Sequence, residues 1–179
     1  MGRLPIRTPR LRLRRLRPGD AAAVTVLMGN WNVVKQTGGI PYPYSEAAAR
    51  DWIAVEARDW ARGVGCSLAV EDRETGALCG AVSLRASRSQ LGFRRGELGY
   101  WLGEPYWGRG LATEAVTAAL AWFAPLARVR TIEAVTFAEN HRSIGVLTKA
   151  GFRLRRIATR SYPARGGRRH IHLYQWAVR

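Results

Sequence analysis

Lysine and the acidic residues are scarce in this sequence, whereas arginine is abundant. Of 179 residues, 27 are Arg and only 2 are Lys (Lys35 and Lys149), against 13 Asp and Glu together, so the formal net charge is +16. Codon bias in a GC-rich genome produces the same preference for Arg, so much of the charge carries no functional information. The net charge still predicts attraction to polyanions such as nucleotides, nucleic acid and ribosomes. Arginine density alone does not indicate a dedicated nucleic-acid-binding protein.

Long apolar runs and cysteine clusters are also missing. No run of about 18 apolar residues is present, which excludes a transmembrane helix. Residues 1–16 alternate Arg with Leu and lack the apolar core of a signal peptide, so we expect a cytoplasmic protein. Cys66 and Cys79, the only two cysteines, form neither a CxxC motif nor a Cys/His cluster. We therefore expect buried free thiols and no zinc site.

The composition that remains suits one compact domain, residues 1–179 with a core of about 8–179, because 47% of the residues are hydrophobic. Residues 10–14 read Arg-Leu-Arg-Leu-Arg, which predicts a strand with one buried and one solvated face. Pro18-Gly19-Asp20 ends this strand. We expect Asp20 to cap a helix whose buried stripe is Val24, Leu27 and Met28.

A second helix follows an irregular segment. Residues 38–44 are too rich in Gly and Pro for regular structure. Ser45 is the expected N-cap of the helix, in which Ile53, Ala57 and Trp60 follow the helical spacing.

In the middle of the chain, hydrophobic residues recur at every second position. Cys66, Leu68 and Val70 alternate, a turn follows at 73–76, and alternation resumes over 78–84, which predicts a hairpin. A further strand is expected at 97–102. Gly99 inside it suggests a bulge or a close backbone approach.

The remainder alternates helices with strands. A helix after residue 110 has a core stripe that consists of Val116, Ala119, Leu120 and Phe123. A strand at 131–137, a helix at about 140–150 stopped by Gly151, and closing strands near 152–159 and 170–178 complete the order βααβββαβαββ. This order predicts a mixed α/β domain without repeats or a dividing linker. The basic, Gly-rich segment 163–169 is expected to be a mobile loop.

One turn has the properties of an anion-binding site. After the strand that contains Tyr100, Trp101 and Leu102, the sequence Gly108-Arg109-Gly110 opens directly into a helix. The first N–H groups of a helix are unpaired, the helix dipole is positive there, and glycine lets a phosphate approach the backbone. A tight turn that needs glycine for its dihedral angles explains the spacing equally well. A Rossmann site fits worse because the third glycine is absent, and no Gly-Lys-Ser/Thr follows for a Walker A loop.

A second constellation lies at the following strand-to-helix junction. Asn140 is placed to cap the helix, and Ser143 lies one turn further on, at the same end of the sheet. Both positions also suit purely local hydrogen bonds.

Taken together, these segments resemble the GNAT superfamily of acyl-CoA-dependent N-acetyltransferases. The resemblance rests on the order of the elements, the turn at 107–112 and the Asn-x-x-Ser helix. The stretches 8–14, 41–45 and 147–152 further resemble the RimJ/RimL branch, the ribosomal-protein N-terminal acetyltransferases. The resemblance covers nearly the whole chain in the right order. It implies a central, mostly antiparallel sheet of seven strands flanked by about four helices.

The resemblance also implies acetyl-CoA as co-substrate and no metal. The backbone of Tyr100, Trp101 and Leu102 would pair with the pantetheine arm, Asn140 would bond it, and Ser143 would lie near the sulfur. The turn would hold the pyrophosphate, and Arg109 would add positive charge. The residues of this turn are Trp107, Gly108, Arg109, Gly110, Leu111, Ala112 and Thr113. The superfamily's general motif opens with Gln or Arg where this chain has Trp107, but Trp is common in this branch.

The implied reaction is direct attack of a neutral amine on the thioester. A backbone N–H near Trp101 or Leu102 would stabilise the oxyanion. A thiol has an unperturbed pKa of about 8.5, so the leaving group needs only modest protonation, for which Ser143 is the candidate. Members of the branch are read as using a Glu just after the Gly-Phe pair, but arginines occupy that place here. Glu97 is our candidate base, acting through water, although pairing with an arginine explains it equally well.

Four aromatic residues would flank the acceptor amine, namely Trp31, Tyr42, Tyr44 and Trp52. An aromatic cluster is also commonly part of a core. His170 and His172 alternate on the last strand, and without a third ligand we expect packing or surface roles for them.

The leading interpretation is therefore an N-acetyltransferase acting on a protein N-terminus, with a ribosomal protein as the first candidate, or on a small-molecule amine. The net charge argues against polycationic acceptors unless an acidic pocket overrides it. A homodimer is compatible with the sequence. The alternatives are a basic nucleic-acid- or ribosome-binding module of the same fold and a coenzyme A-binding regulator without catalysis. No recognised nucleic-acid motif supports the former.

Overall fold

The computed structural model describes residues 4–88 and 94–177. Eight strands form one sheet in the order β1-β2-β3-β4-β5-β6-β8-β7, and all neighbours are antiparallel except β5 and β6. The strands are β1 (Ile6–Arg7), β2 (Leu11–Arg15), β3 (Gly65–Asp72), β4 (Leu78–Arg88), β5 (Arg94–Leu102), β6 (Thr131–Phe137), β7 (Arg153–Tyr162) and β8 (Gly167–Ala177). The helices are α1 (Ala21–Met28), α2 (Trp31–Val34), α3 (Glu46–Arg62), α4 (Leu111–Ala127) and α5 (His141–Lys149).

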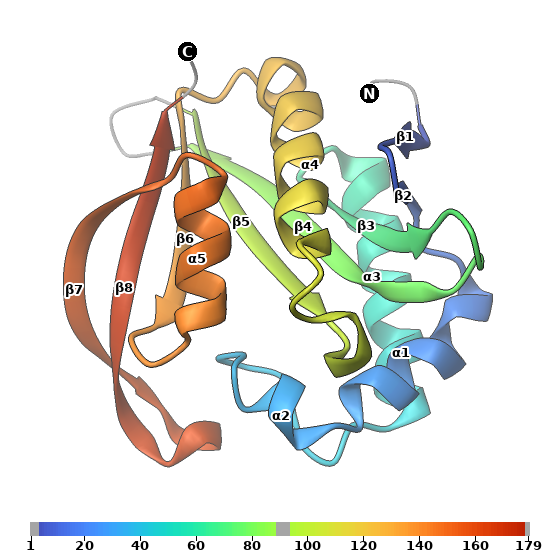
Figure 1. Ribbon diagram of the computed structural model, residues 1–179, viewed down its shortest axis with the longest axis horizontal. Coiled ribbons are helices and arrows are strands. Elements are labelled where there is room, and N and C mark those ends of the chain that lie inside the picture. Colours follow the sequence, from blue (N-terminus) through green and yellow to red (C-terminus); the bar gives the residue numbers. More distant parts are fainter. Residues whose placement is uncertain (1–3, 89–93, 178–179) are drawn as a thin grey trace.

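The expected mixed, mostly antiparallel α/β sheet is confirmed, with one strand and one helix more than predicted. The additional elements are β1, of two residues, and α2, of four. Neither is long enough to show a hydrophobic period in the sequence. Helices α4 and α5 cover one face of the sheet, whereas α1 and α3 lie against the other (Figure 1).

Strand β2 is less solvated than its alternating sequence predicts. Leu11 and Leu13 are fully buried, as predicted, but Arg14 on the opposite face is only 8% exposed. The Arg14 guanidinium binds Asp20 at 2.8 Å and Glu71 at 2.5 Å. The alternation was therefore read correctly as a strand, but the predicted solvated face was wrong at Arg14, which is buried because these carboxylates neutralise it.

Helix α1 begins where it was expected, but Asp20 does not cap it. The Asp20 carboxylate instead accepts from Arg14 and from the backbone N–H of Arg17 at 2.8 Å. In α3, Ser45 is the N-cap and accepts from the N–H of Ala48. The predicted stripe of α3 was partly wrong: Ala57 is exposed. Its place on the buried side is taken by Glu56, which is 4% exposed.

The predicted hairpin is confirmed as β3 and β4. Both faces of β3 are buried, since one face packs below α4 and the other below α3. Cys66 and Cys79 are free and buried, as expected. Burial raises the pKa of the Cys66 thiol to about 12 and that of Cys79 to about 11.

Gly99 marks neither a bulge nor a crowded backbone. The register between β4 and β5 is unbroken from Gly80↔Leu102 to Arg88↔Arg94. A Cβ on Gly99 would meet only the Cβ of Ser83, at 3.9 Å. Gly99 instead follows the last pair between β5 and β6, Leu98↔Ala134.

The C-terminal elements were largely predicted correctly, apart from the loop between the last strands. Strand β6 has the predicted bounds, the predicted core stripe of α4 is buried, and Gly151 ends α5 with a φ of 90°. The segment expected to be a mobile loop at 163–169 is a short 3-10 turn (Pro163–Arg165) followed by the start of β8. The side chain of Arg165 in this turn is buried. No helix within 4–88 and 94–177 is long and apolar enough to cross a membrane.

Candidate active site

Two neighbouring strands part in the middle of the sheet. Strand β5 stays paired with β4 as far as Leu102, but its pairing with β6 ends at Leu98. A cavity of about 820 Å³ opens there, lined by the end of β5, the start of α4, α5 and the segment around α2. The parted strands leave backbone groups of β5 without a strand partner on that side, so an extended ligand can pair with them.

The Gly-Arg-Gly turn has the geometry of an anion cradle. Gly108 and Gly110 have φ values of 74° and 76°, in the left-handed region that favours glycine. Gly110 is the N-cap of α4 and supplies no side-chain cap, so the first N–H groups of α4 are free to bind a ligand. A Cβ on Gly108 would meet nothing within 4 Å, so the turn is open on that side. The residues present therefore fit a phosphate group.

This turn is braced from the N-terminal end of the sheet. Glu114, in the first turn of α4, accepts hydrogen bonds from the hydroxyl of Thr8 at 2.6 Å and from Nε of Arg10 at 2.7 Å. The Arg10 guanidinium also donates to the carbonyl of Arg109 at 2.7 Å. The motif at 8–14 and the turn at 107–112 are thus parts of one hydrogen-bonded unit.

Trp107 closes the turn toward the interior. Its indole N–H donates to the carbonyl of Leu102 at 2.8 Å. The guanidinium of Arg142, from α5, lies over the indole at 5.0 Å. Because the Leu102 carbonyl already has this partner, it is less available to a bound pantetheine than was expected.

Asn140, Ser143 and Tyr100 line the cavity where β5 and β6 separate. The side chain of Asn140 caps α5 by accepting from the N–H of Ser143 at 3.1 Å. The hydroxyl of Ser143 lies 2.7 Å from the phenol oxygen of Tyr100, which comes from β5 on the other side of the split. Burial raises the pKa of Tyr100 to about 12, although the hydrogen bond with Ser143 acts in the opposite direction. Sequence reasoning assigned Tyr100 only a backbone role and missed this side-chain contact.

The other end of the cavity is formed by the segment 33–41, which is fixed from two sides. Arg165 donates to the carbonyls of Thr37 at 2.8 Å and Val34 at 3.2 Å, and to that of Ile40. Glu104 accepts from the side chains of Asn30 and Asn32 on the opposite side. The pKa of Arg165 is lowered by burial. Helix α2 and the tip of the β7–β8 hairpin accordingly lie together at one end of the sheet (Figure 1).

The structure brings most of the predicted coenzyme residues to this cavity. Those that line it are Tyr100, Trp101, Leu102, Trp107, Gly108, Gly110, Leu111, Ala112, Thr113, Asn140 and Ser143. Arg109 and Glu97 do not line it, and both are exposed. Their predicted roles, and those of the lining residues, stay predictions.

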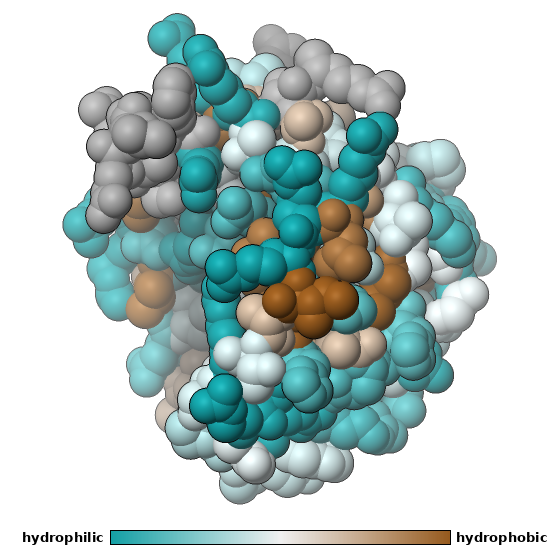
Figure 2. Space-filling model, turned by 90° about the vertical axis from the view of Figure 1, so that its left-hand side faces the viewer, coloured by the Kyte–Doolittle hydropathy of each residue, from teal (hydrophilic) through white to brown (hydrophobic). Residues whose placement is uncertain are grey.

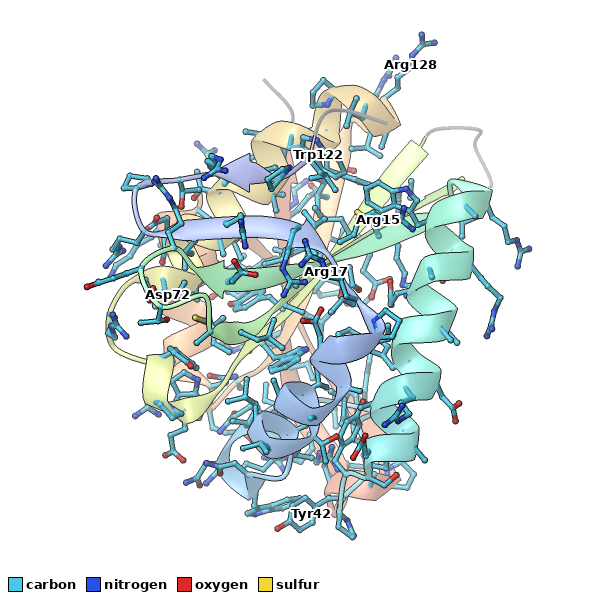
Figure 3. The ribbon with its side chains drawn as sticks, turned by 90° about the vertical axis from the view of Figure 1, so that its right-hand side faces the viewer. Arg15, Arg17, Tyr42, Asp72, Trp122 and Arg128 are labelled. Atoms are coloured by element: carbon cyan, nitrogen blue, oxygen red, sulfur yellow. The ribbon has the colours of Figure 1, made fainter. Side chains whose placement is uncertain are left out.

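The four predicted acceptor aromatics separate into two pairs. Tyr44 and Trp52 line the cavity. Trp31 and Tyr42 lie outside it, 45% and 50% exposed, with ring centroids 5.0 Å apart. Figure 3 shows Tyr42 at the end of the molecule beyond α1.

The charged side chains that line the cavity are basic. Arg142 and Lys149 of α5 line it, and sequence reasoning gave neither a role at the site, although their spacing of seven residues places them on one helix face. Among the described residues that line it, none is Asp or Glu. Outside the cavity, no group of three or more described His, Cys, Asp or Glu residues could hold a metal ion.

Comparison with known proteins agrees with this geometry. An uncharacterized N-acetyltransferase of Bacillus subtilis, YoaA, is 28% identical over 147 residues, covering 82% of this chain and 81% of that protein. A ribosomal-protein-alanine acetyltransferase from Vibrio fischeri superimposes with a TM-score of 0.85 at 17% identity, over 98% of this chain and 97% of the other.

RimL, a ribosomal-protein α-N-acetyltransferase solved with coenzyme A, superimposes with a TM-score of 0.84 at 18% identity, over 98% of both chains. The model of the acetyltransferase (GNAT) domain family matches residues 10–153. The expectation of an acyl-CoA-dependent N-acetyltransferase that uses acetyl-CoA is thereby confirmed. The chain belongs to the acetyltransferase (GNAT) domain family.

Proposed function

We propose that this protein transfers the acetyl group of acetyl-CoA to the α-amine of a polypeptide, with a ribosomal protein as the first candidate. The observation that carries the acceptor class is the cavity lining, which holds Arg142 and Lys149 but no carboxylate among its described residues. Two of the structurally similar proteins are named as acetyltransferases of ribosomal proteins. A polycationic acceptor finds no counter-charge in such a cavity.

The pKa of the amine supports the same acceptor. A nucleophilic amine must be neutral, and an α-amine has a pKa of about 7.7–8.0 against about 10.4 for a lysine side chain. At pH 7 roughly one α-amine in seven is neutral, compared with fewer than about one lysine in a thousand. Without a carboxylate beside the thioester, the amine with the lower pKa is the better substrate.

The chain's own residues would act as follows. The turn around Gly110 holds the pyrophosphate, and free backbone groups of β5 near Trp101 pair with the pantetheine arm and stabilise the oxyanion. The hydroxyl of Ser143 donates to the leaving sulfur. Holding the amine and the thioester in line supplies much of the acceleration.

Glu97 stays our candidate base, and only through water, because its side chain is exposed and outside the cavity. The Glu97→Gln variant distinguishes proton removal by Glu97 from direct loss of the amine proton to solvent. A pH–rate profile whose acidic limb moves to higher pH supports Glu97, whereas an unchanged profile assigns proton removal to bulk water.

The first experiment is a calorimetric titration with acetyl-CoA at about 0.15 M salt, where the Debye length of about 8 Å weakens loose polyanion attraction. We expect saturable one-to-one binding that Gly110→Val abolishes, since a β-branched residue is strained at this φ of 76°. Gly19→Val is the matched control, because a Cβ on Gly19 meets nothing within 4 Å. Absence of saturable binding would refute the proposal and favour the alternative of a basic RNA-binding module.

The acceptor is tested next with a pair of peptides. One peptide has a free N-terminus and no lysine, and the other has a blocked N-terminus and a single lysine. Acetylation of the first peptide alone supports the α-amine assignment, and preference for the second overturns it.

A further inference from the structure

Tyr100 and Ser143 form a pair of hydroxyl groups across the split in the sheet. The phenol oxygen of Tyr100 lies 2.7 Å from Oγ of Ser143 and 3.2 Å from the carbonyl oxygen of the same residue. Both residues line the cavity. Tyr100 belongs to β5, whereas Ser143 belongs to the first turn of α5, so the contact joins the two sides of the cavity.

A phenol has one hydrogen, so Tyr100 can donate to only one of these two oxygens at a time. When Tyr100 donates to Oγ of Ser143, the hydroxyl hydrogen of Ser143 is free to point into the cavity. When Tyr100 donates to the carbonyl, its oxygen accepts from Ser143 instead, and Ser143 has no hydrogen left for a ligand. The 2.7 Å contact with Oγ fits either hydroxyl as donor, and a thiolate in the cavity, which can only accept a hydrogen bond, selects the first arrangement.

Tyr100 itself does not release its proton in this arrangement. Burial raises its pKa to about 12, well above the value of about 8.5 of an ordinary thiol. At neutral pH the phenol therefore remains a donor, and a departing thiolate is too weak a base to deprotonate it through Ser143.

We propose that Tyr100 is a positioning residue for the transfer reaction, which sets the hydroxyl of Ser143 so that its hydrogen points toward the leaving sulfur. The inference rests on the proposed function, in which Ser143 faces that sulfur. The C–N bond forms as the amine attacks, the C–S bond breaks, and the electron pair stays on sulfur. Ser143 stabilises the thiolate by its hydrogen bond, and the proton lost by nitrogen goes to solvent. Tyr100 and Ser143 end the cycle in their starting protonation states.

The contact is tested with a double-mutant cycle of Tyr100→Phe, Ser143→Ala and the combination. Tyr100→Phe keeps the ring and removes only the hydroxyl. We expect kcat to fall by between about 10-fold and 100-fold in Tyr100→Phe, with the KM for acetyl-CoA nearly unchanged. Because Tyr100 acts through Ser143, adding Tyr100→Phe to Ser143→Ala should cost nothing further.

The matched control is Tyr174→Phe, which removes the phenol hydroxyl of a buried tyrosine that does not line the cavity. Its kcat should equal that of the parent protein. Multiplicative losses in the double variant, or a Tyr100→Phe variant with full kcat, would overturn the positioning role. A loss that appears in KM alone, or in thermal stability alone, would assign Tyr100 a structural role. A parent protein that binds acetyl-CoA but acetylates no amine would refute the proposed function, an outcome separate from all of these.

Discussion

Arginine has different surroundings in the two halves of this sheet. In the N-terminal half, Arg14 and Arg85 each bind two carboxylates on neighbouring elements. After Glu139 the sequence has no acidic residue, although residues 140–179 carry nine Arg and one Lys. The arginines of β7 are exposed, and hydrophilic side chains cover much of the face that carries β7 and β8 (Figure 2).

The difference shows where the net charge of +16 resides. Codon bias can replace lysine by arginine, but it does not remove Asp and Glu from one end of a chain. Arg14 and Arg85 therefore belong to ion-pair networks of the internal structure, whereas residues 140–179 carry most of the uncompensated charge, with Arg165 as their buried exception. Substitutions in the two sets should have very different effects.

The largest effect is expected from Arg14→Met. This change leaves Asp20 and Glu71 buried without their shared partner, and removal of one member of a buried ion pair costs about 3–5 kcal/mol of unfolding free energy. Urea denaturation measures it. A loss of less than about 1 kcal/mol would mean that the two carboxylates find other partners or water.

Arg165→Met should cost less, about 1–3 kcal/mol, because it leaves buried carbonyls of the segment 34–40 without a donor. The end of the cavity formed by the segment 33–41, which precedes the predicted acceptor residue Tyr44, should loosen, so we expect the KM for the acceptor to rise while the Kd for acetyl-CoA is unchanged. Arg168→Met is the control, since Arg168 is exposed in the same hairpin. Equal effects of the two substitutions would show that the buried contacts of Arg165 do not shape the acceptor site.

Acidification should produce a smaller and graded loss of stability. Burial alone would raise the pKa of Asp20 and Glu71, but the hydrogen bonds from Arg14 outweigh it and hold both below their ordinary values. The unfolded chain then binds protons more readily than the folded one. The stabilisation is complete above the unfolded values of about 3.9 and 4.3 and is lost as the pH falls through the lower folded values. Denaturation midpoints between pH 6 and 3 should fall less steeply in Arg14→Met.

The smallest effect is expected from Arg155→Gln combined with Arg156→Gln on β7. Both side chains are exposed and form no ion pair within the described residues, so the unfolding free energy should change by less than about 0.5 kcal/mol. A larger loss would contradict the division between the two halves. Thermal denaturation of the parent and the double variant in one buffer decides the matter.

Local signals in the sequence predicted much of this fold. The strand at 131–137 and the cap at Ser45 are determined by neighbouring residues, and both were correct. Asp20 and Arg165 were misread because their partners lie on other elements, where no local pattern records them. The same holds in the cavity: the spacing of Gly108 and Gly110 was visible, whereas the contact between Tyr100 and Ser143 joins positions 43 residues apart.

The contacts of Arg165 have a consequence for the order in which the protein matures during synthesis. Residues 108–110 are synthesised before residue 165, so the proposed phosphate-binding turn is made while the segment 34–40 still lacks its donor. Under the proposed function, the parts that recognise the coenzyme and the acceptor are thus synthesised at different times. An acceptor site that includes this segment would be complete only after the last hairpin has packed against it.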